Sequence, residues 1–114
     1  MKALLAGDFL GALTLFKAAD KATTNLMVIE DDGSLIDVTA DTVAVEIYQN
    51  NARDAAASLS ISATIVTATA GLCSISPTDV ETDTLNTGTY QYYVKWTEAD
   101  GTIHMSGPGI CTVK

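Results

Sequence analysis

The sequence predicts an all-β fold, an immunoglobulin-size antiparallel β-sandwich of about seven to nine short strands. Three observations support this prediction. Apolar and polar residues alternate along several segments, glycine-containing turn signals recur roughly every ten residues, and helical signals are confined to one short segment. Because the chain has 114 residues, residues 1–114 are expected to share a single core.

The N-terminal region, residues 3–19, is ambiguous, because its apolar residues fit both a helical stripe and an alternating strand. Gly7 and Gly11 would each destabilise a helix by about 1 kcal/mol, which favours a strand from about Asp8 to Lys17. The residues before this strand, 1–7, are expected to form an extended apolar arm.

Alternation is clearest in segments 43–49, 59–65 and 90–96. In the last of these, Tyr90, Tyr92 and Trp96 share one face, which is expected to point into the core. The other expected strands are 26–30, 35–38, 65–69, 72–76, 102–106 and 110–113.

Turn signals containing Gly33, Gly71 and Gly101 separate these strands, because glycine readily adopts a positive φ. The Asp100-Gly101 pair is the strongest hairpin signal in the chain. Residues 107–109, Gly-Pro-Gly, interrupt the last strand, which predicts a bulge or an edge break there.

Helical structure is expected at most as one short turn at residues 77–83, where proline comes first and acidic residues follow. Residues 50–57 are polar and alanine-rich, and we expect them to form a loop or a short turn.

One corner of the fold has a more specific signature. Leu85 is followed by Gly88 and then by Tyr90, which begins a long strand. This order resembles the tyrosine corner of immunoglobulin-like sandwiches, whereas Tyr90 as an ordinary core aromatic is the alternative. The residues expected to be structurally important are Gly88, Tyr90, Tyr92, Trp96 and Gly101.

The charge of the chain argues against two classes of partner. Fourteen acidic and six scattered basic residues give a net charge of −8, so the chain lacks the basic surface that nucleic-acid backbones and anionic membranes require. No apolar stretch is long enough to span a bilayer. We therefore expect neither nucleic acid nor membrane as a partner, and high solubility.

The two cysteines, Cys73 and Cys111, form no CxxC motif, which excludes zinc ribbons and thioredoxin-like sites. They are expected to be small apolar core residues with free thiols, and an inter-strand disulfide in an oxidising compartment is the alternative.

Catalytic and cofactor sites are not indicated. His104 is the one histidine, and no nucleophile motif surrounds it, although Ser106 lies two residues later. Glu98 and Asp100 are interpreted as soluble turn residues rather than as a catalytic carboxylate pair. EF-hand calcium loops aligned on Gly33 and on Gly101 both fail the required ligand spacing. The acidic segments 30–32 and 79–83 are interpreted as solvated turn residues, with irregular calcium-binding loops as the alternative. We expect no enzyme activity, metal or cofactor.

The sequence resembles one known family. The pattern Leu85-x-x-Gly88-x-Tyr90-x-Tyr92-x-Val94, followed by an Asp-Gly hairpin and a final strand at 107–113, is similar to small immunoglobulin-like domains of tailed-phage virions, including the N-terminal domain of baseplate upper proteins. Segments 7–9 (Gly-Asp-Phe) and 42–48 also fit that pattern. The chain departs from it at Ala6, where a polar residue is usual, and in having no coiled coil or receptor-binding module after Lys114.

This resemblance implies a non-enzymatic virion protein assembled in the host cytoplasm. The missing module favours a capsid decoration (cement) protein on the outer surface of the head, with a tail or baseplate component and a non-viral β-sandwich binding module as alternatives. The expected partners are the major capsid protein and further copies of the chain, for instance in a homotrimer. The N-terminal arm is expected to add a strand to a neighbour's sheet through Met1, Lys2, Ala3, Leu4, Leu5 and Ala6.

Overall fold

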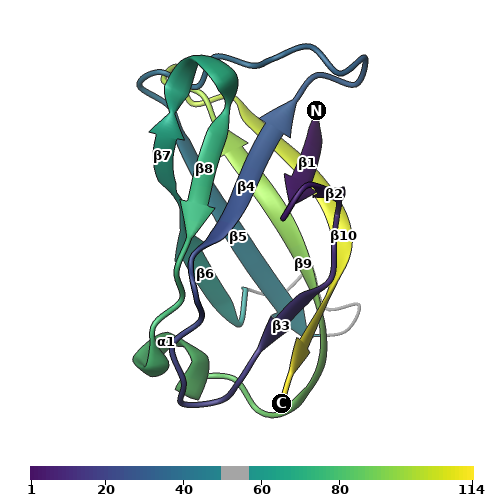
Figure 1. Cartoon of the computed structure of the whole chain (residues 1–114), viewed down its shortest axis with the longest axis vertical. Coiled ribbons are helices and arrows are strands. Elements are labelled where there is room, and N and C mark those ends of the chain that lie inside the picture. The colour runs from purple at the N-terminus through teal and green to yellow at the C-terminus, as the bar shows by residue number, and fades with distance from the viewer. Residues whose placement is uncertain (50–56) are drawn as a thin grey trace.

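The computed structural model describes residues 1–49 and 57–114, which form two five-stranded sheets packed face to face (Figure 1). Sheet A has the strand order β2 (Asp8–Phe9), β1 (Lys2–Leu5), β4 (Thr24–Ile29), β8 (Leu72–Ile75) and β7 (Thr64–Thr67). Sheet B has the order β3 (Leu13–Leu15), β10 (Ile103–Val113), β9 (Gly88–Thr97), β5 (Thr42–Gln49) and β6 (Leu59–Ser62).

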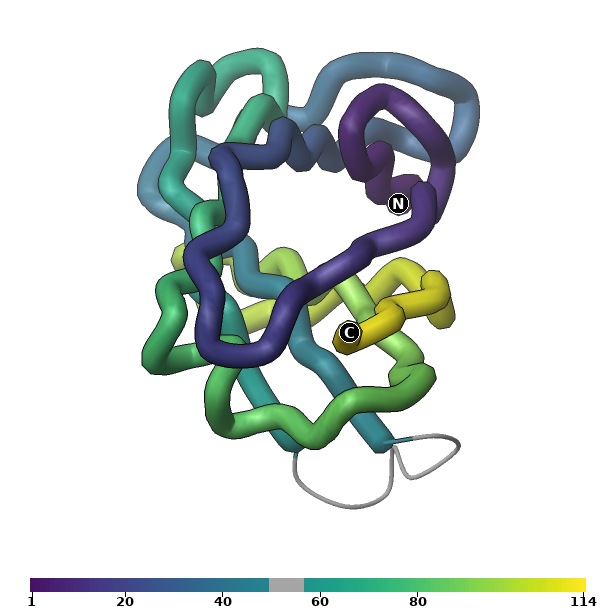
Figure 2. The backbone as a smooth tube through the Cα atoms, turned by 60° about the horizontal axis from the view of Figure 1, so that its bottom comes forward, coloured from purple at the N-terminus to yellow at the C-terminus, as the bar shows by residue number. Residues whose placement is uncertain are grey.

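This topology confirms the predicted immunoglobulin-like β-sandwich. Strands β1, β4, β8 and β7 take the places of A, B, E and D in such domains, and β10, β9, β5 and β6 take those of G, F, C and C′. One pairing departs from an antiparallel arrangement: β3 runs parallel to β10, with Leu13 opposite Cys111 and Leu15 opposite Val113. Figure 2 shows this contact, where the end of the yellow C-terminal strand lies beside the purple N-terminal segment.

The core follows from the alternation along the strands. In β9, every second residue from Tyr90 to Trp96 is buried, and Tyr92 has no exposed surface. The prediction that Tyr90, Tyr92 and Trp96 point inward is therefore confirmed. Cys73 on β8 and Cys111 on β10 are buried free thiols, as expected for small apolar core residues.

The N-terminal arm is the clearest difference from the sequence-based expectations. Residues Lys2–Leu5 form β1, which pairs antiparallel with β4, and Ala3 and Leu5 are buried in the core. The terminal amine of Met1 lies 2.9 Å from Asp31 Oδ1. The prediction of a free extended arm is wrong, because alternate residues of this segment contribute to the core and its backbone is already paired.

The expected continuous strand from Asp8 to Lys17 is also wrong. The segment contains β2 and β3, which belong to different sheets, and the chain turns between them at Leu10, where φ is 48°. The choice of strand over helix for this region was nevertheless correct.

The expected strand 59–65 is divided at Ala63 between β6 in sheet B and β7 in sheet A. The other elements follow the prediction with local changes. Helix α1 (Asp79–Asp83) begins after the capping residue Thr78, and a 3-10 turn, η1 (Ala68–Ala70), adds a second short helical element. The expected strand 35–38 is reduced to one bridge between Leu35 and Ile29. At Gly-Pro-Gly 107–109, β10 continues through a bulge. The expected loop 50–57 lies outside the described residues, apart from Ala57.

The tyrosine corner is confirmed by its hydrogen bond. Tyr90 Oη donates to the backbone oxygen of Asn86 at 2.9 Å, which ties the start of β9 to the segment before it. The Asp-Gly hairpin is confirmed as well, since Gly101 has a φ of 93° and its amide donates to the Glu98 carbonyl at 2.9 Å.

Candidate functional site

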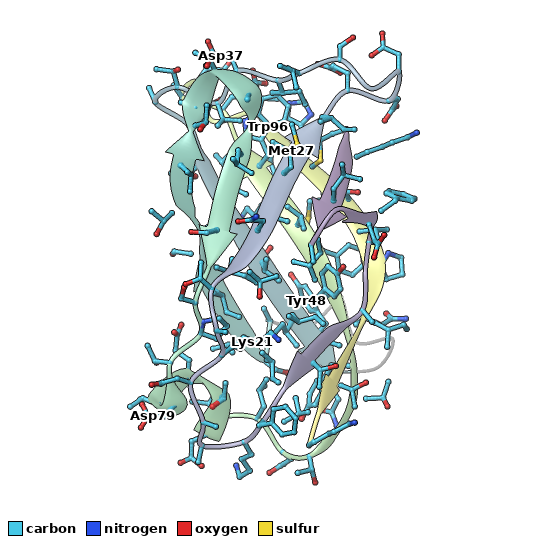
Figure 3. All side chains as sticks on the ribbon, in the orientation of Figure 1. Lys21, Met27, Asp37, Tyr48, Asp79 and Trp96 are labelled. Atoms are coloured by element: carbon cyan, nitrogen blue, oxygen red, sulfur yellow. The ribbon has the colours of Figure 1, made fainter. Side chains whose placement is uncertain are left out.

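Carboxylates gather at one end of the sandwich. The β4–β5, β7–β8 and β9–β10 loops meet there beside the N-terminus, at the top of Figure 1, and Figure 3 labels Asp37 among them. Half of the chain's fourteen acidic residues lie in or next to these loops, namely Glu30, Asp31, Asp32, Asp37, Asp41, Glu98 and Asp100.

Most of these carboxylates have local hydrogen-bond partners. Asp32 and Asp100 each accept a backbone N–H from two residues later, and these bonds hold their pKa values below the usual range. The pKa of Asp37 is lowered by the Thr39 hydroxyl and then by the Thr39 N–H, both of which donate to its carboxylate. The pKa of Asp31 is lowered by the N-terminal ammonium group. Within residues 1–49 and 57–114, no three His, Cys, Asp or Glu side chains converge as a metal site requires. Asp32, Asp37 and Asp100 therefore stabilise the turns in which they lie.

The only histidine belongs to the same end of the molecule. The His104 ring stacks on Trp96, with 4.4 Å between ring centroids, and its Nε2 lies 2.8 Å from Glu98 Oε2. Ser106 is buried on the same strand, opposite Val94. His104 is therefore packed against the start of the β9–β10 hairpin, and Glu98 is paired with it rather than with Asp100.

Asp41 joins this cluster to the β4–β5 loop. Its Oδ2 accepts the Trp96 Nε1–H at 2.9 Å, and its Oδ1 accepts the Ala99 amide at 2.9 Å. Sequence reasoning missed Asp41, because no local pattern links it to a tryptophan 55 positions away.

Asp41→Ala is expected to destabilise the domain by about 1–3 kcal/mol, because it leaves the largely buried Trp96 N–H without its acceptor. Urea unfolding followed by the fluorescence of Trp96, the only tryptophan, measures this loss. Asp37→Ala is the control, since Asp37 is an exposed turn residue, and it should cost clearly less. Equal losses in the two variants would contradict the role given to Asp41.

The outer face of sheet A carries a second feature, an apolar row that crosses the sheet. Leu4 lies opposite Phe9 on one side and Met27 on the other, and Met27 lies opposite Leu72. At the far edge, Val66 stands at the bulge of β7 beside Leu72. We call Phe9, Leu4, Met27, Leu72 and Val66 the apolar band.

The apolar band faces away from the core. Neighbours of its members on β1, β4 and β8, namely Leu5, Leu26 and Cys73, are buried, so the intervening side chains point outward. Phe9 and Val66 are each 59% exposed. Figure 3 shows Met27 on β4, in the sheet that faces the viewer.

Neighbouring apolar residues extend the band toward the loop end. Ile29 follows Met27 on the same face of β4 and bridges to Leu35, which is 60% exposed. Lys2 lies beside this extension, with its Nζ 6.0 Å from the centre of the Phe9 ring. All residues of the five strands of sheet A are described, and two of them are charged: Lys2 on β1 and Asp8, which is exposed on the edge strand β2.

The residues expected to make interactions are thus divided between two environments. Lys2 and Leu4 contribute to the outer face, whereas Ala3 and Leu5 belong to the core. Sequence reasoning missed Phe9, Met27 and Leu72. A usable signal was present in segment 26–29, Leu-Met-Val-Ile, which is apolar on both faces of a strand and so indicates contact on both sides.

No protein-family model and no curated protein sequence matches this chain. Among solved structures the chain is similar to the crystal structure of CopC from Methylosinus trichosporium OB3b, with a TM-score of 0.45 and 15% sequence identity, over 90% of this chain and 84% of that chain. At this degree of similarity we take neither a function nor a ligand from CopC.

These comparisons correct the functional expectation drawn from the sequence. No family model or curated protein supports a capsid decoration function or its tail or baseplate alternative, and the solved structure reported above is a CopC rather than a virion protein, so that prediction is withdrawn. None of the helices in residues 1–49 and 57–114 has the length and apolar composition needed to cross a membrane.

Proposed function

We propose that this chain is a non-enzymatic interaction domain that binds a protein partner through the outer face of sheet A. The observation that carries the proposal is the apolar band, which crosses all five strands and is joined by Ile29 and Leu35. Monomeric soluble proteins seldom expose contiguous apolar areas larger than a few hundred Å², and larger areas usually mark binding surfaces.

The composition of this face supports the proposal further. The centres of protein interfaces are enriched in aromatic residues and methionine and depleted of charged residues. The apolar band contains Phe9 and Met27, and the two charged residues of these strands, Lys2 and Asp8, lie on the edge-side strands β1 and β2.

Affinity purification from source cells with quantitative mass spectrometry tests this proposal. Phe9→Glu places a charge in the apolar band at an exposed position, where it should not prevent folding, and it is expected to lower recovery of the principal partner at least tenfold. Ile110→Glu is the matched control, because Ile110 is 52% exposed on the outer face of sheet B. Its partner recovery should equal that of the wild type.

The His104→Ala variant tests whether binding depends on the cluster around Trp96 at the loop end. His104 lies away from the apolar band, packed on Trp96, so its removal should leave partner recovery unchanged. If Phe9→Glu and Ile110→Glu retain the same partners in equal amounts, the outer face of sheet A is not the binding surface.

A further inference from the structure

We infer that the partner of the apolar band is a second copy of this chain, so that two copies associate with sheet A against sheet A. This inference rests on the proposed function and names its partner. Three properties of the face support it: its charge, its size and its symmetry.

The distribution of charge favours a second copy. Two copies of a chain with a net charge of −8 repel each other, and like charges placed directly opposite are destabilising. The strands of sheet A hold one carboxylate, Asp8, which is exposed at the edge of the sheet on β2, whereas most other acidic residues lie at the loop end and around α1. Two copies can therefore meet across the centre of this face without opposing carboxylates.

The same distribution argues against a basic partner. Opposite charges steer association, so a basic protein would be drawn to the acidic loop end and not to a face whose strands carry one lysine, Lys2, and one carboxylate, Asp8. An apolar, nearly uncharged partner surface is the better complement, and a second sheet A provides one.

The size of the molecule is compatible with a stable dimer. Figure 1 views the molecule down its shortest axis onto sheet A, and the extents of the whole chain in this view are 36 and 29 Å. This outline of about 1,000 Å² is the upper limit of the contact, and stable protein interfaces bury roughly 800 Å² per partner.

The geometry of the band suits a twofold contact. Twofold dimers use the same patch on both copies, and facing sheets pack with their strands within about 30° of each other. The band lies across the strands from Phe9 to Val66. A twofold axis that lies between the two sheets, parallel either to the strands or to the band, places the band of one copy on the band of the other. Met27 and Leu72 then lie near the centre of the contact.

Sedimentation velocity of the full chain over a range of concentrations tests this inference. The wild type is expected to shift from 11.9 kDa to twice that mass as concentration rises. Phe9→Glu and Met27→Glu should each weaken dimerisation at least tenfold, because each carboxylate enters the contact twice. Ile110→Glu should dimerise like the wild type. Circular dichroism verifies that each variant is folded.

Cysteine cross-linking provides a second readout that does not depend on destabilising the contact. Both native thiols are buried, so a cysteine introduced at an outward position is the reactive one. Met27→Cys should form disulfide-linked dimers under mild oxidation, whereas Ile110→Cys should not.

The outcomes separate this inference from the proposed function. A wild type that stays monomeric up to about 1 mM overturns the inference. If such a monomer still loses a captured protein on Phe9→Glu, the interaction face stands with a different partner. If it is monomeric and captures the same proteins with both Glu variants, the proposed function fails as well. Dimers that are disrupted by Ile110→Glu and not by Phe9→Glu would move the contact to sheet B and overturn the inference.

Discussion

Gly109→Ala is expected to lower the free energy of unfolding by about 3 kcal/mol or more. A Cβ atom at Gly109 would lie 2.4 Å from both Cε1 and Cζ of the Tyr92 ring. Tyr92 has no exposed surface, and its hydroxyl donates to the Gly11 carbonyl at 2.5 Å. The ring therefore has no free space to enter, and a shift would break this hydrogen bond. Overpacking of a core typically costs about 1–3 kcal/mol, and loss of the bond adds to that cost.

Urea denaturation of Gly109→Ala measures the effect, and two further variants define its cause. Gly33→Ala is the control: Gly33 has a φ of 91° with no atom within 4 Å of the added Cβ, so only backbone strain of about 1–2 kcal/mol is expected. In Gly109→Ala/Tyr92→Leu the clashing ring is absent, and the further loss caused by Gly109→Ala should largely disappear. Wild-type stability of Gly109→Ala would show that β9 and β10 are not packed this closely.

The domain is expected to lose stability steeply between about pH 9 and pH 12. Burial raises the pKa of Cys111 from 9.0 to about 12, and burial together with the Cys111 charge raises the pKa of Tyr92 from 10.0 to about 12. Both groups are acids whose pKa is raised by folding, so the native state keeps protons that the unfolded chain releases. Their contribution to the free energy of unfolding is complete below pH 9 and is lost as the pH rises toward 12.

The expected size of this alkaline effect is roughly 7 kcal/mol by pH 12, because the pKa of Cys111 rises by about 3 and that of Tyr92 by about 2, and each unit of pKa difference corresponds to about 1.4 kcal/mol. That is comparable with the whole stability of many small domains. Urea midpoints at pH 8, 9, 10 and 11 measure the slope. Cys111→Ala should be less stable at pH 8 but should lose less stability between pH 9 and pH 10. A wild-type midpoint that stays constant to pH 11 would contradict the burial of these groups.

The success of the sequence-based prediction depended on how local each signal was. Strands β5 and β9 were predicted because each buries alternate residues, which a period of two reveals without knowledge of the partner strand. The tyrosine corner was predicted for the same reason, since Tyr90 bonds to a carbonyl only four residues earlier. In both cases the sequence segment itself contains the whole pattern.

The N-terminal region was predicted poorly because its structure depends on distant partners. The burial of Ala3 and Leu5 follows from the pairing of β1 with β4, and β3 is held by the last strand of the chain. The apolar band could not be predicted either. It arises from the registers of β2, β1, β4, β8 and β7, which bring residues from Leu4 to Leu72 into one row.

The parallel pairing of β3 and β10 has a mechanical consequence. A tensile force applied through the two ends of the chain would draw β3 toward the N-terminal side and β10 toward the C-terminal side. Because the strands run in the same direction, this force shears the pairs from Leu13–Cys111 to Leu15–Val113 all at once, whereas antiparallel strands pulled from one end separate pair by pair. After β1 and β2 have detached from sheet A, the β3–β10 pairing is the contact that resists further extension of the domain.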